Sequence, residues 1–557
     1  MGARATFRGF NDAKSVQLEV RVDAHASTAL ISIRRCHLFR ANRRARARRE
    51  RVRDGSPAVR GIASTRHMKL TSSHPRVTHL PPTPQRARPV RGRAGSRKHL
   101  FATAAVKEPE TSTAETPTLS WRAAIDFKKL KDDPAAAQTN ADNRAAPCDV
   151  AKVCELYDAF QSLNRECDEI RELRNANAKS MKGKLEPDAR AALIAEGKEL
   201  KDKLAALEGT LGGLEFQLQT EGQKVPNDTH PETPVGGEEL AVLRREVGAK
   251  RDFSFEAASH VDVGERLGMF DFETGGKVCG SRFVYLTGAG AMLELALINW
   301  AMAKVVSKGF KPMVVPDVVR QNTMEKCGFQ PRAENTQVYN IENSDLCLAG
   351  TAEILLGGVC MDEVLSEKEL PVKMAAFSHC FRTEAGAAGA ATRGLYRLHQ
   401  FSKVEMFVVA TPAQSDTIHD ELIAIEEEMY AELGFHFKVL DMSSQDLGAP
   451  AYRKFDIEAW MPALGRYGEI SSASNCTDYQ ARRLNIKFRP DPVDGKKQPL
   501  QHCHTLNATA CAVPRMIITI LENFQNEDGS VTVPGPLRPF MGGVETLTPE
   551  VVREAEA

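Results

Sequence analysis

Two stretches of the chain carry apolar residues at alternating steps of three and four. The first runs from Val150 to about Ala178, and its apolar positions are Val153, Leu156, Phe160, Leu163, Cys167 and Ile170. After a break at 182–187, the second series consists of Leu200, Leu204, Leu207, Leu211, Leu214 and Leu218. Sustained three-four spacing is the seam of a coiled coil. The short Gly- and Pro-containing connection predicts two antiparallel helices, an arm about 45 Å long.

A helical hairpin packed against a globular body would show the same periodicity. The apolar stripe is only two positions wide per heptad, which favours a free-standing helix pair over a core helix. The outer faces carry Lys, Arg and Glu together, so charge alone does not indicate a nucleic-acid partner. A Pro-rich stretch at 224–236 ends the arm and is predicted to be a linker.

Alternation of period two dominates the chain between Arg382 and Glu405. If this segment forms two antiparallel strands, Arg382 and Glu384 share one face of the first strand. On the second strand, the rule separates a polar face from an apolar face: Arg397, His399, Phe401, Lys403 and Glu405 against Leu398, Val404, Met406 and Val408. A polar floor of this kind suits a nucleotide, because arginine forks bind phosphates, a ring stacks on a base and a carboxylate holds an amine. An ordinary half-buried hairpin with a charged outer face would alternate in the same way.

Thr351, Ala352 and Glu353 precede an apolar run and are suited to holding a small amino acid. A carboxylate pairs with an ammonium group, and a hydroxyl senses a substrate hydroxyl. The alternative is a helix start in which Thr351 is the N-cap and Glu353 lies in the first turn.

Two further segments carry candidate phosphate and cation ligands. In the segment around 467–483, Glu469 and Ser471 share one strand parity, and Ser472 lies opposite unless the strand is irregular there. In the segment 504–525, Pro514 suits a first helical turn and places Arg515 near the positive end of a helix, which attracts phosphate. A helix start with a surface arginine is the alternative.

The charge of the chain is unevenly distributed. Residues 1–100 carry 24 Lys and Arg against 5 Asp and Glu, whereas the remaining residues carry 50 against 68. The leader is rich in Arg, Ala and Ser and lacks an apolar core, which is typical of organellar transit peptides. A basic tail that binds nucleic acid would share this composition. Met68 is a candidate internal start with its own targeting stretch.

The 12 cysteines are scattered and include no Cys-x-x-Cys pair, which argues against a disulfide framework and against a zinc ribbon. We expect no zinc at His502-Cys503-His504, because neighbours on a strand point to opposite faces and no second ligand cluster is visible. No window approaches 18 uninterrupted apolar residues, so we expect no membrane span.

Several of these segments together resemble the seryl-tRNA synthetases, a family of class II aminoacyl-tRNA synthetases. The stretch FRTEAG…TRGLYRLHQFSKVEMF resembles motif 2 of that class. The helix from Met292 to Lys308 with the following 309–316 resembles motif 1, and 504–515 resembles motif 3. The stretch 125–134 resembles the family's N-terminal helix, and the Pro-Asn…His…Pro-Val-Gly linker resembles its connection after the coiled coil.

The resemblance covers about residues 120–545 and implies a fold and a domain organisation. The expected fold class is α+β: a class II antiparallel sheet flanked by helices and preceded by the long antiparallel two-helix arm. The expected domains are a transit peptide or basic leader at 1–110, a tRNA-binding coiled-coil domain at 118–230 and a catalytic domain at 237–548. Motif 1 implies a homodimer interface.

The resemblance also assigns the site residues. It implies serine contacts from Thr351, Ala352, Glu353, Arg382, Glu405, Asn507 and Thr509. It implies ATP contacts from Arg382, Thr383, Glu384, Arg397, Leu398, Phe401, Glu469, Ile470, Ser471, Ser472 and Arg515. Arg382, Glu469 and Arg515 are the expected catalytic residues. Mg²⁺ is expected on Glu469 and Ser472, which requires a break or bulge near Ser471.

The implied activity is ATP-dependent ligation of L-serine to tRNA(Ser) through seryl-adenylate, in a chloroplast or mitochondrion. The arm would grip the tRNA. Ala508 and Pro514 stand where bacterial members usually have Gly, and the loop 387–392 lacks the charged residues that many relatives carry there. The alternatives are a paralogue that loads a carrier protein and a non-catalytic RNA-binding protein. The arm argues against the first, and the joint presence of Arg382, Glu384, Glu469 and Arg515 argues against the second.

Overall fold

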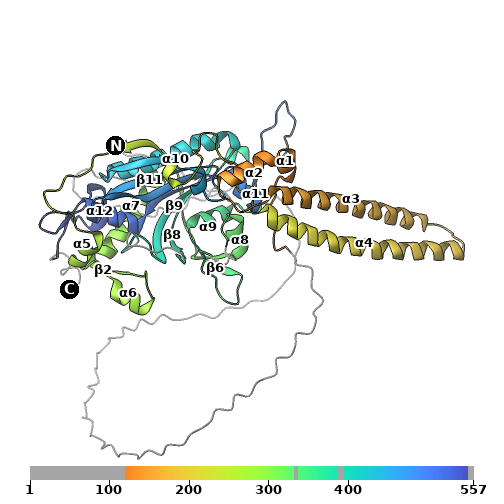
Figure 1. The fold of residues 1–557 in the computed structure, drawn as a ribbon, viewed down its shortest axis with the longest axis horizontal. Helices are drawn as coiled ribbons and strands as arrows, with labels where there is room; N and C mark the ends of the chain where they lie inside the picture. The colour runs from red at the N-terminus through yellow and green to blue at the C-terminus, as the bar shows by residue number, and fades with distance from the viewer. Residues whose placement is uncertain (1–118, 331–335, 385–393, 550–557) are drawn as a thin grey trace, which may run out of the picture. The chain divides into compact units, whose positions relative to one another are not determined.

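The computed structural model of the chain describes residues 119–330, 336–384 and 394–549. The predicted leader at 1–110, including Met68, lies outside these ranges, as does the loop 387–392. The described residues form the two-helix arm and an α+β body (Figure 1).

An eight-stranded sheet forms the centre of the body. In spatial order its strands are β1 (Val242–Val247), β10 (Phe437–Asp441), β11 (Arg453–Met461), β12 (Arg466–Asn475), β15 (His504–Ala512), β9 (Gln400–Ala410), β8 (Val372–Phe381) and β4 (Lys311–Val314). All neighbours pair antiparallel except β4, which lies parallel to β8. The antiparallel sheet predicted from the sequence is confirmed, and β4 adds one parallel edge strand.

The two faces of β9 have different surroundings, as its alternation predicts. Val404, Met406 and Val408 are fully buried in the larger core cluster. Residues of the other parity face the second side of the sheet, where Phe407 joins a smaller core cluster and Glu405 faces the polar site. The same alternation on β15 buries Leu506, Ala508 and Ala510 and turns Asn507 and Thr509 to the polar side.

Helices cover both faces of this sheet (Figure 1). The larger core contains residues of α7 (Gly288–Ser307), α10 (Ser415–Glu432) and α12 (Val513–Asn523). The smaller core contains residues of α8 (Gln321–Lys326), α9 (Ala352–Val359) and α11 (Tyr479–Leu484). The polar site therefore shares its face of the sheet with the smaller core.

Short elements complete the body. They are the helices α5 (His260–Arg266) and α6 (Phe272–Val278) and the strands β2 (Phe270–Asp271), β3 (Tyr285–Leu286), β5 (Val318–Arg320), β6 (Leu346–Leu348), β7 (Val364–Ser366), β13 (Lys487–Arg489), β14 (Gln501–His502), β16 (Val531–Thr532) and β17 (Thr546–Leu547).

Helix α7 is long and apolar enough to cross a membrane by length and composition, and 44% of that window is buried in the protein. Leu293, Leu297 and Trp300 on its inner face belong to the larger core. It begins four residues before the predicted Met292, at Gly288, and ends at Ser307. The buried face identifies α7 as a helix of the core.

The arm consists of α3 (Val150–Ser180) and α4 (Pro187–Gly222), which lie side by side (Figure 1). Cys167, Ile170 and Leu204 form a cluster made of arm residues alone. This confirms the predicted antiparallel helix pair. Two short helices precede the arm, α1 (Phe127–Asp132) and α2 (Pro134–Asn143), because Asp133 caps the second helix and Pro134 begins it.

Near the tip of the arm a polar contact replaces the apolar seam. The buried Asn177 donates from its side chain to Leu193 O at 3.1 Å and to a Glu196 carboxylate oxygen at 2.7 Å. Leu173 and Ile194 are exposed there. Helix α4 begins at Pro187, well before its first predicted seam residue, Leu200. Its first turns pack through Asn177 and do not follow the leucine pattern.

Arg144 connects the end of α2 to the linker after the arm and to the body. Its guanidinium donates to Asn227 O at 3.0 Å, Asp228 O at 3.1 Å and Ala451 O at 2.8 Å, and also contacts Gly448 O. Burial lowers the pKa of Arg144 to about 10, which leaves the group charged at neutral pH.

We expect Arg144→Ala to lower the free energy of unfolding by about 3 kcal/mol, because several buried carbonyl oxygens lose their donor. Urea unfolding measures this loss. Arg171→Ala is the matched control, since its ion pairs with Asp168 and Glu208 are exposed and its loss costs about 0.5 kcal/mol or less. Equal losses in the two variants would show that Arg144 does not hold the junction.

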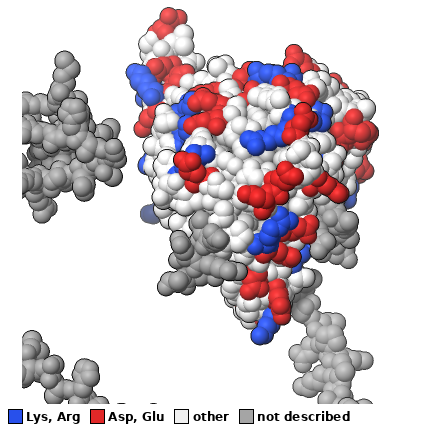
Figure 2. All heavy atoms as spheres, turned by 90° about the vertical axis from the view of Figure 1, so that its left-hand side faces the viewer, with Lys and Arg blue, Asp and Glu red and all other residues white. Residues whose placement is uncertain are grey.

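Cations and anions are interspersed on the end of the molecule drawn in Figure 2 rather than gathered by sign. Exposed or half-exposed ion pairs occur along α10, including Lys308 with Glu428 at 2.5 Å and Lys373 with Glu421 at 2.6 Å. Each such pair contributes about 0–1 kcal/mol, because water screens both charges.

Candidate active site

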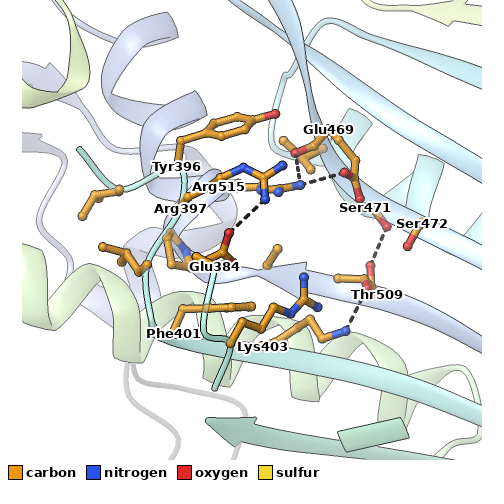
Figure 3. Close-up of a pocket in the computed structure, with 16 residues that line it drawn as sticks. Glu384, Tyr396, Arg397, Phe401, Lys403, Glu469, Ser471, Ser472, Thr509 and Arg515 are labelled. Atoms are coloured by element: carbon orange, nitrogen blue, oxygen red, sulfur yellow. Dashed lines mark hydrogen bonds and ion pairs between the residues drawn. The ribbon is translucent and has the colours of Figure 1, made fainter. Parts of the chain in front are cut away.

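A pocket of about 100 Å³ opens on the polar face of the sheet (Figure 3). It is lined by all the predicted nucleotide-binding residues except Thr383, namely Arg382, Glu384, Arg397, Leu398, Phe401, Glu469, Ile470, Ser471, Ser472 and Arg515. Thr383 turns away, and its hydroxyl donates to Thr336 O at 2.7 Å. Strands β9, β12 and β15, the start of α12 and the segments that join β8 to β9 supply the lining.

Two arginines lie against aromatic rings in this pocket. The guanidinium carbon of Arg382 is 5.2 Å from the centre of the Phe401 ring. That of Arg515 is 4.7 Å from the centre of the Tyr396 ring. Each contact places a cation and an aromatic ring beside the same space. A nucleotide requires both, because the cation binds its phosphates and the ring stacks on its base.

The predicted strand pair is present, but it is shorter than the polar alternation suggested. Strand β8 ends at Phe381 and β9 begins at Gln400, so Arg382, Glu384, Arg397 and His399 lie outside the two strands. Placing these four by strand parity was therefore wrong. Glu384 has a φ of +51° and pairs with Arg397 at 2.9 Å.

His399, predicted on the polar floor, lies elsewhere. Its ring stacks on Phe283 at 5.2 Å between ring centres, and its Nδ1 contacts the Tyr339 hydroxyl at 2.7 Å. Because both contacts are outside the pocket, His399 supports the turn before β9 and does not line the site.

Glu469 and Ser472 lie on the same wall of the pocket (Figure 3). The pairing of β11 with β12 shifts by one residue between Glu469 and Ser471, opposite Ile457 and Glu458. This is the irregularity that the sequence required near Ser471. The Ser471 hydroxyl instead donates to Thr509 O at 2.7 Å, which ties β12 to β15.

Arg515 is held by two oxygens of Glu469. Its guanidinium donates to the Glu469 carbonyl at 2.9 Å and lies 3.0 Å from the carboxylate. Pro514 stands in the first turn of α12, as predicted. Burial would raise the pKa of Glu469, but the charges of Arg515, Lys454 and Arg382 outweigh it and lower the pKa below its usual value.

The donor set at Glu469 and Ser472 suits a hard cation. One carboxylate and one hydroxyl face the pocket, and Mg²⁺ takes such oxygens while keeping several waters or phosphate oxygens. Among the residues that the structure describes, no group of three or more His, Cys, Asp and Glu side chains is placed to hold a metal. A cation here would therefore depend on oxygens from water or substrate.

A second group of polar side chains surrounds Glu353. The carboxylate accepts from the Gln480 amide at 2.6 Å and from the Asn507 amide at 3.2 Å. Thr351 accepts from the Glu353 N–H at 3.3 Å and is the N-cap of α9, so the helix-start interpretation of these residues also holds. Ala352 is fully buried in the smaller core.

The carboxylate of Glu405 lies near enough to Glu353 for its charge to act on it. Burial, and then the charge of Glu405, raises the pKa of Glu353 to about 7, against the effects of Gln480, Lys403 and Arg382. Glu405 is buried, accepts from the Thr509 hydroxyl at 3.3 Å and pairs with Lys403. Two neighbouring carboxylates, one buried and one half-buried, suit a cationic ligand such as an ammonium group.

Residues 124–229 match the family model described as the seryl-tRNA synthetase N-terminal domain. Residues 337–524 match the model described as the tRNA synthetase class II core domain (G, H, P, S and T). The serine–tRNA ligase of Treponema denticola is 45% identical over 421 residues, which cover 75% of this chain and 99% of that protein.

The chain belongs to the seryl-tRNA synthetase family. The mitochondrial serine–tRNA ligase of Mus musculus is also similar, with 46% identity over 70% of this chain and 75% of its own length. Among solved structures, the seryl-tRNA synthetase of Pyrococcus horikoshii complexed with ATP has a TM-score of 0.70 and 35% identity. That match covers 76% of this chain and 99% of the other.

The synthetase is therefore a class II serine–tRNA ligase by family. Its pocket also contains residues that sequence reasoning did not select: Leu395, Tyr396, Lys403, Ala512 and Pro514. Lys403 was predicted on the polar face of β9, but it was not predicted to line the pocket. Tyr396 lies in a turn, where no alternation marks a residue that faces the site.

Proposed function

We propose that the chain ligates L-serine to tRNA(Ser) in two steps, through a seryl-adenylate intermediate. The observation that carries this proposal is the position of Arg382. It lines the nucleotide pocket over the Phe401 ring, and its charge lowers the pKa of Glu469 in that pocket and of Glu353 in the small polar group, so it lies near both groups. A cation there faces both reacting groups, the carboxylate of an amino acid and the α-phosphate of ATP.

In the first step, a carboxylate oxygen of serine attacks the α-phosphorus of ATP. The bond from that phosphorus to the bridging oxygen breaks, and pyrophosphate leaves with the electron pair. No protein base is required, because a carboxylate is already an anion at neutral pH. Arg382 and Arg515 lower the barrier by orienting the reactants and neutralising charge. A terminal ribose hydroxyl of the tRNA then attacks the carbonyl of the adenylate. The bond from that carbonyl carbon to the phosphate oxygen breaks, AMP leaves with the electron pair, and the hydroxyl proton is released.

The nucleotide would be held by the pocket residues in distinct roles. Phe401 offers a ring face to adenine, and Glu384 offers a carboxylate to its amino group. Arg515 meets the γ-phosphate near the N-terminus of α12. Glu469 and Ser472 would hold Mg²⁺, which when bound neutralises phosphate charge.

The group around Glu353 would recognise serine. The neighbouring carboxylates of Glu353 and Glu405 suit the ammonium group, and the Asn507 amide and the Thr509 hydroxyl donate to one of them each. Alanine leaves these buried polar groups without partners and is rejected strongly, whereas threonine is rejected only by the space that its extra methyl requires.

The arm would bind the tRNA, and a second copy of the chain would complete a dimer. The motif 1 elements α7 and β4 carry exposed apolar side chains, among them Leu295, 54% exposed, and Val314, 98% exposed. Apolar surface of this kind is stabilised by burial in an interface.

We expect Val314→Asp to weaken the dimer at least tenfold, because a carboxylate would be buried in an apolar contact. Sedimentation velocity over a concentration series measures the change. Val364→Asp, an exposed valine outside the motif 1 region, is the control. A wild-type protein that sediments as a monomer at all concentrations would contradict the dimer.

The basic leader would direct the synthetase to an organelle. The similarity to a mitochondrial relative favours the mitochondrion over the chloroplast. Residues 1–110 fused to a fluorescent protein should carry it into mitochondria. Accumulation in the nucleus would instead indicate a basic nucleic-acid-binding tail.

Charging assays test the activity as a whole. The purified protein should attach serine to tRNA(Ser) in the presence of ATP and should leave other tRNAs uncharged. Transfer of serine to a carrier protein with no transfer to tRNA would contradict the proposal.

A further inference from the structure

Gln480 lies behind the serine-binding group and contacts no pocket space. The side chain is fully buried on α11 and is absent from the lining of the nucleotide pocket. Its amide nitrogen is 2.6 Å from a Glu353 carboxylate oxygen and 3.2 Å from Cys327 O. Among the described residues, the hydrogen bond to Glu353 is therefore what links Gln480 to the site.

A hydroxyl on β15 holds the other end of the same amide. Thr505 is fully buried, and its hydroxyl donates to the Gln480 side-chain oxygen at 2.7 Å. A reversed amide would place its oxygen against the carbonyl of Cys327 and the carboxylate of Glu353, two acceptors. Only one orientation satisfies every group, because the two acceptors require the amide nitrogen. The Thr505 hydroxyl then donates to the amide oxygen and holds the other end of the side chain.

We propose that Gln480, anchored by Thr505, is a positioning residue that holds the Glu353 carboxylate in place and ionised for the ammonium group of serine. This inference rests on the proposed function, because it takes serine as the ligand of Glu353. A hydrogen bond donated to a carboxylate stabilises the charged form, and a buried carboxylate without it is more readily protonated.

The charges around Glu353 explain why such a donor is needed. Burial, and then the charge of Glu405 on β9, raises the pKa of Glu353. The charges of Lys403 on the same strand and of Arg382 lower it. The buried thiols of Cys327 and Cys476 also lie close. With the pKa of Glu353 raised to about 7, protonation weakens serine binding as the pH falls through that value.

The test is serine-dependent ATP–pyrophosphate exchange by the full chain between pH 6 and pH 8.5, with wild type and Gln480→Met. At pH 7 we expect the variant to raise the KM for serine about tenfold and to leave the KM for ATP within about twofold. In wild type the KM for serine falls as the pH rises through about 7. In the variant that fall moves to higher pH by about one unit. Thr505→Val should also move the pH at which the KM for serine falls to a higher value, by less than Gln480→Met does.

Gln525→Met is the matched control. Gln525 is also buried, and its amide bonds backbone oxygens of Ala258 and Glu522 away from the site, so its loss lowers stability without moving the pH profile. If Gln480→Met leaves the KM for serine unchanged, or raises that KM equally at every pH, this inference is overturned and the proposed function is not. A wild-type protein with no serine-dependent exchange would overturn the proposed function and this inference with it.

Discussion

Replacing Arg382 by alanine is expected to lower serine-dependent pyrophosphate exchange by about three orders of magnitude, or about 4 kcal/mol of transition-state stabilisation. Among the described residues, Arg382 has no ion-pair partner that would hold it away from substrate, and its guanidinium lies over Phe401. Its charge is felt by both Glu353 and Glu469. In the proposed mechanism, removing it takes away the cation that faces the carboxylate and the α-phosphate together.

Two comparisons separate this loss from misfolding. Arg382→Lys should recover part of the activity, since lysine keeps the charge and loses the planar fork. Arg320→Ala removes an exposed arginine paired with Asp345 and should exchange like wild type. Arg382→Ala with more than a tenth of wild-type exchange would show that the arginine does not contact the reacting groups.

Shortening the arm is expected to separate the two steps of the reaction. The removal of residues 164–210, closed by a short glycine-rich turn, takes away the outer hairpin and keeps the contacts of α1 and α2 with the body. Adenylate formation should stay within about twofold of wild type. Charging of tRNA(Ser) should fall by about 100-fold, which corresponds to about 2.8 kcal/mol of lost tRNA binding.

The matched control for this deletion keeps the length of the arm. Lys203→Ala with Glu166→Ala removes one exposed ion pair between α3 and α4 and should alter charging little. Equal charging by the shortened and full-length proteins would contradict the role of the arm. A parallel loss of adenylate formation would show that the deletion damaged the body.

The parts of the fold that repeat a simple period were predictable from the sequence. The steps of three and four along α3 and α4 identified the arm, because an apolar seam must recur in this way. The alternation on β9 separated Glu405 from Met406, because successive strand residues face opposite sides. The pattern failed where regular structure ends, at Glu384 and His399, whose positions depend on turns and on partners such as Phe283.

Contacts between distant segments could not be read from any period. Gln480 reaches Glu353 across 127 positions because α11 and α9 pack in one core. Glu426 stands in a run of three glutamates that reads as a solvated helix face, yet it is fully buried. Burial raises its pKa well above the usual value. The burial of Glu426 follows from the tertiary packing of α10.

Serine-dependent ATP–pyrophosphate exchange by the wild-type protein, with alanine and threonine as controls, tests the central claim most directly. Exchange with serine, strong rejection of alanine and weaker rejection of threonine are the predicted results, because the proposed serine site pairs its polar groups with the serine hydroxyl. A folded protein that exchanges with none of the three amino acids would contradict the account and would indicate an RNA-binding protein that lacks adenylate chemistry.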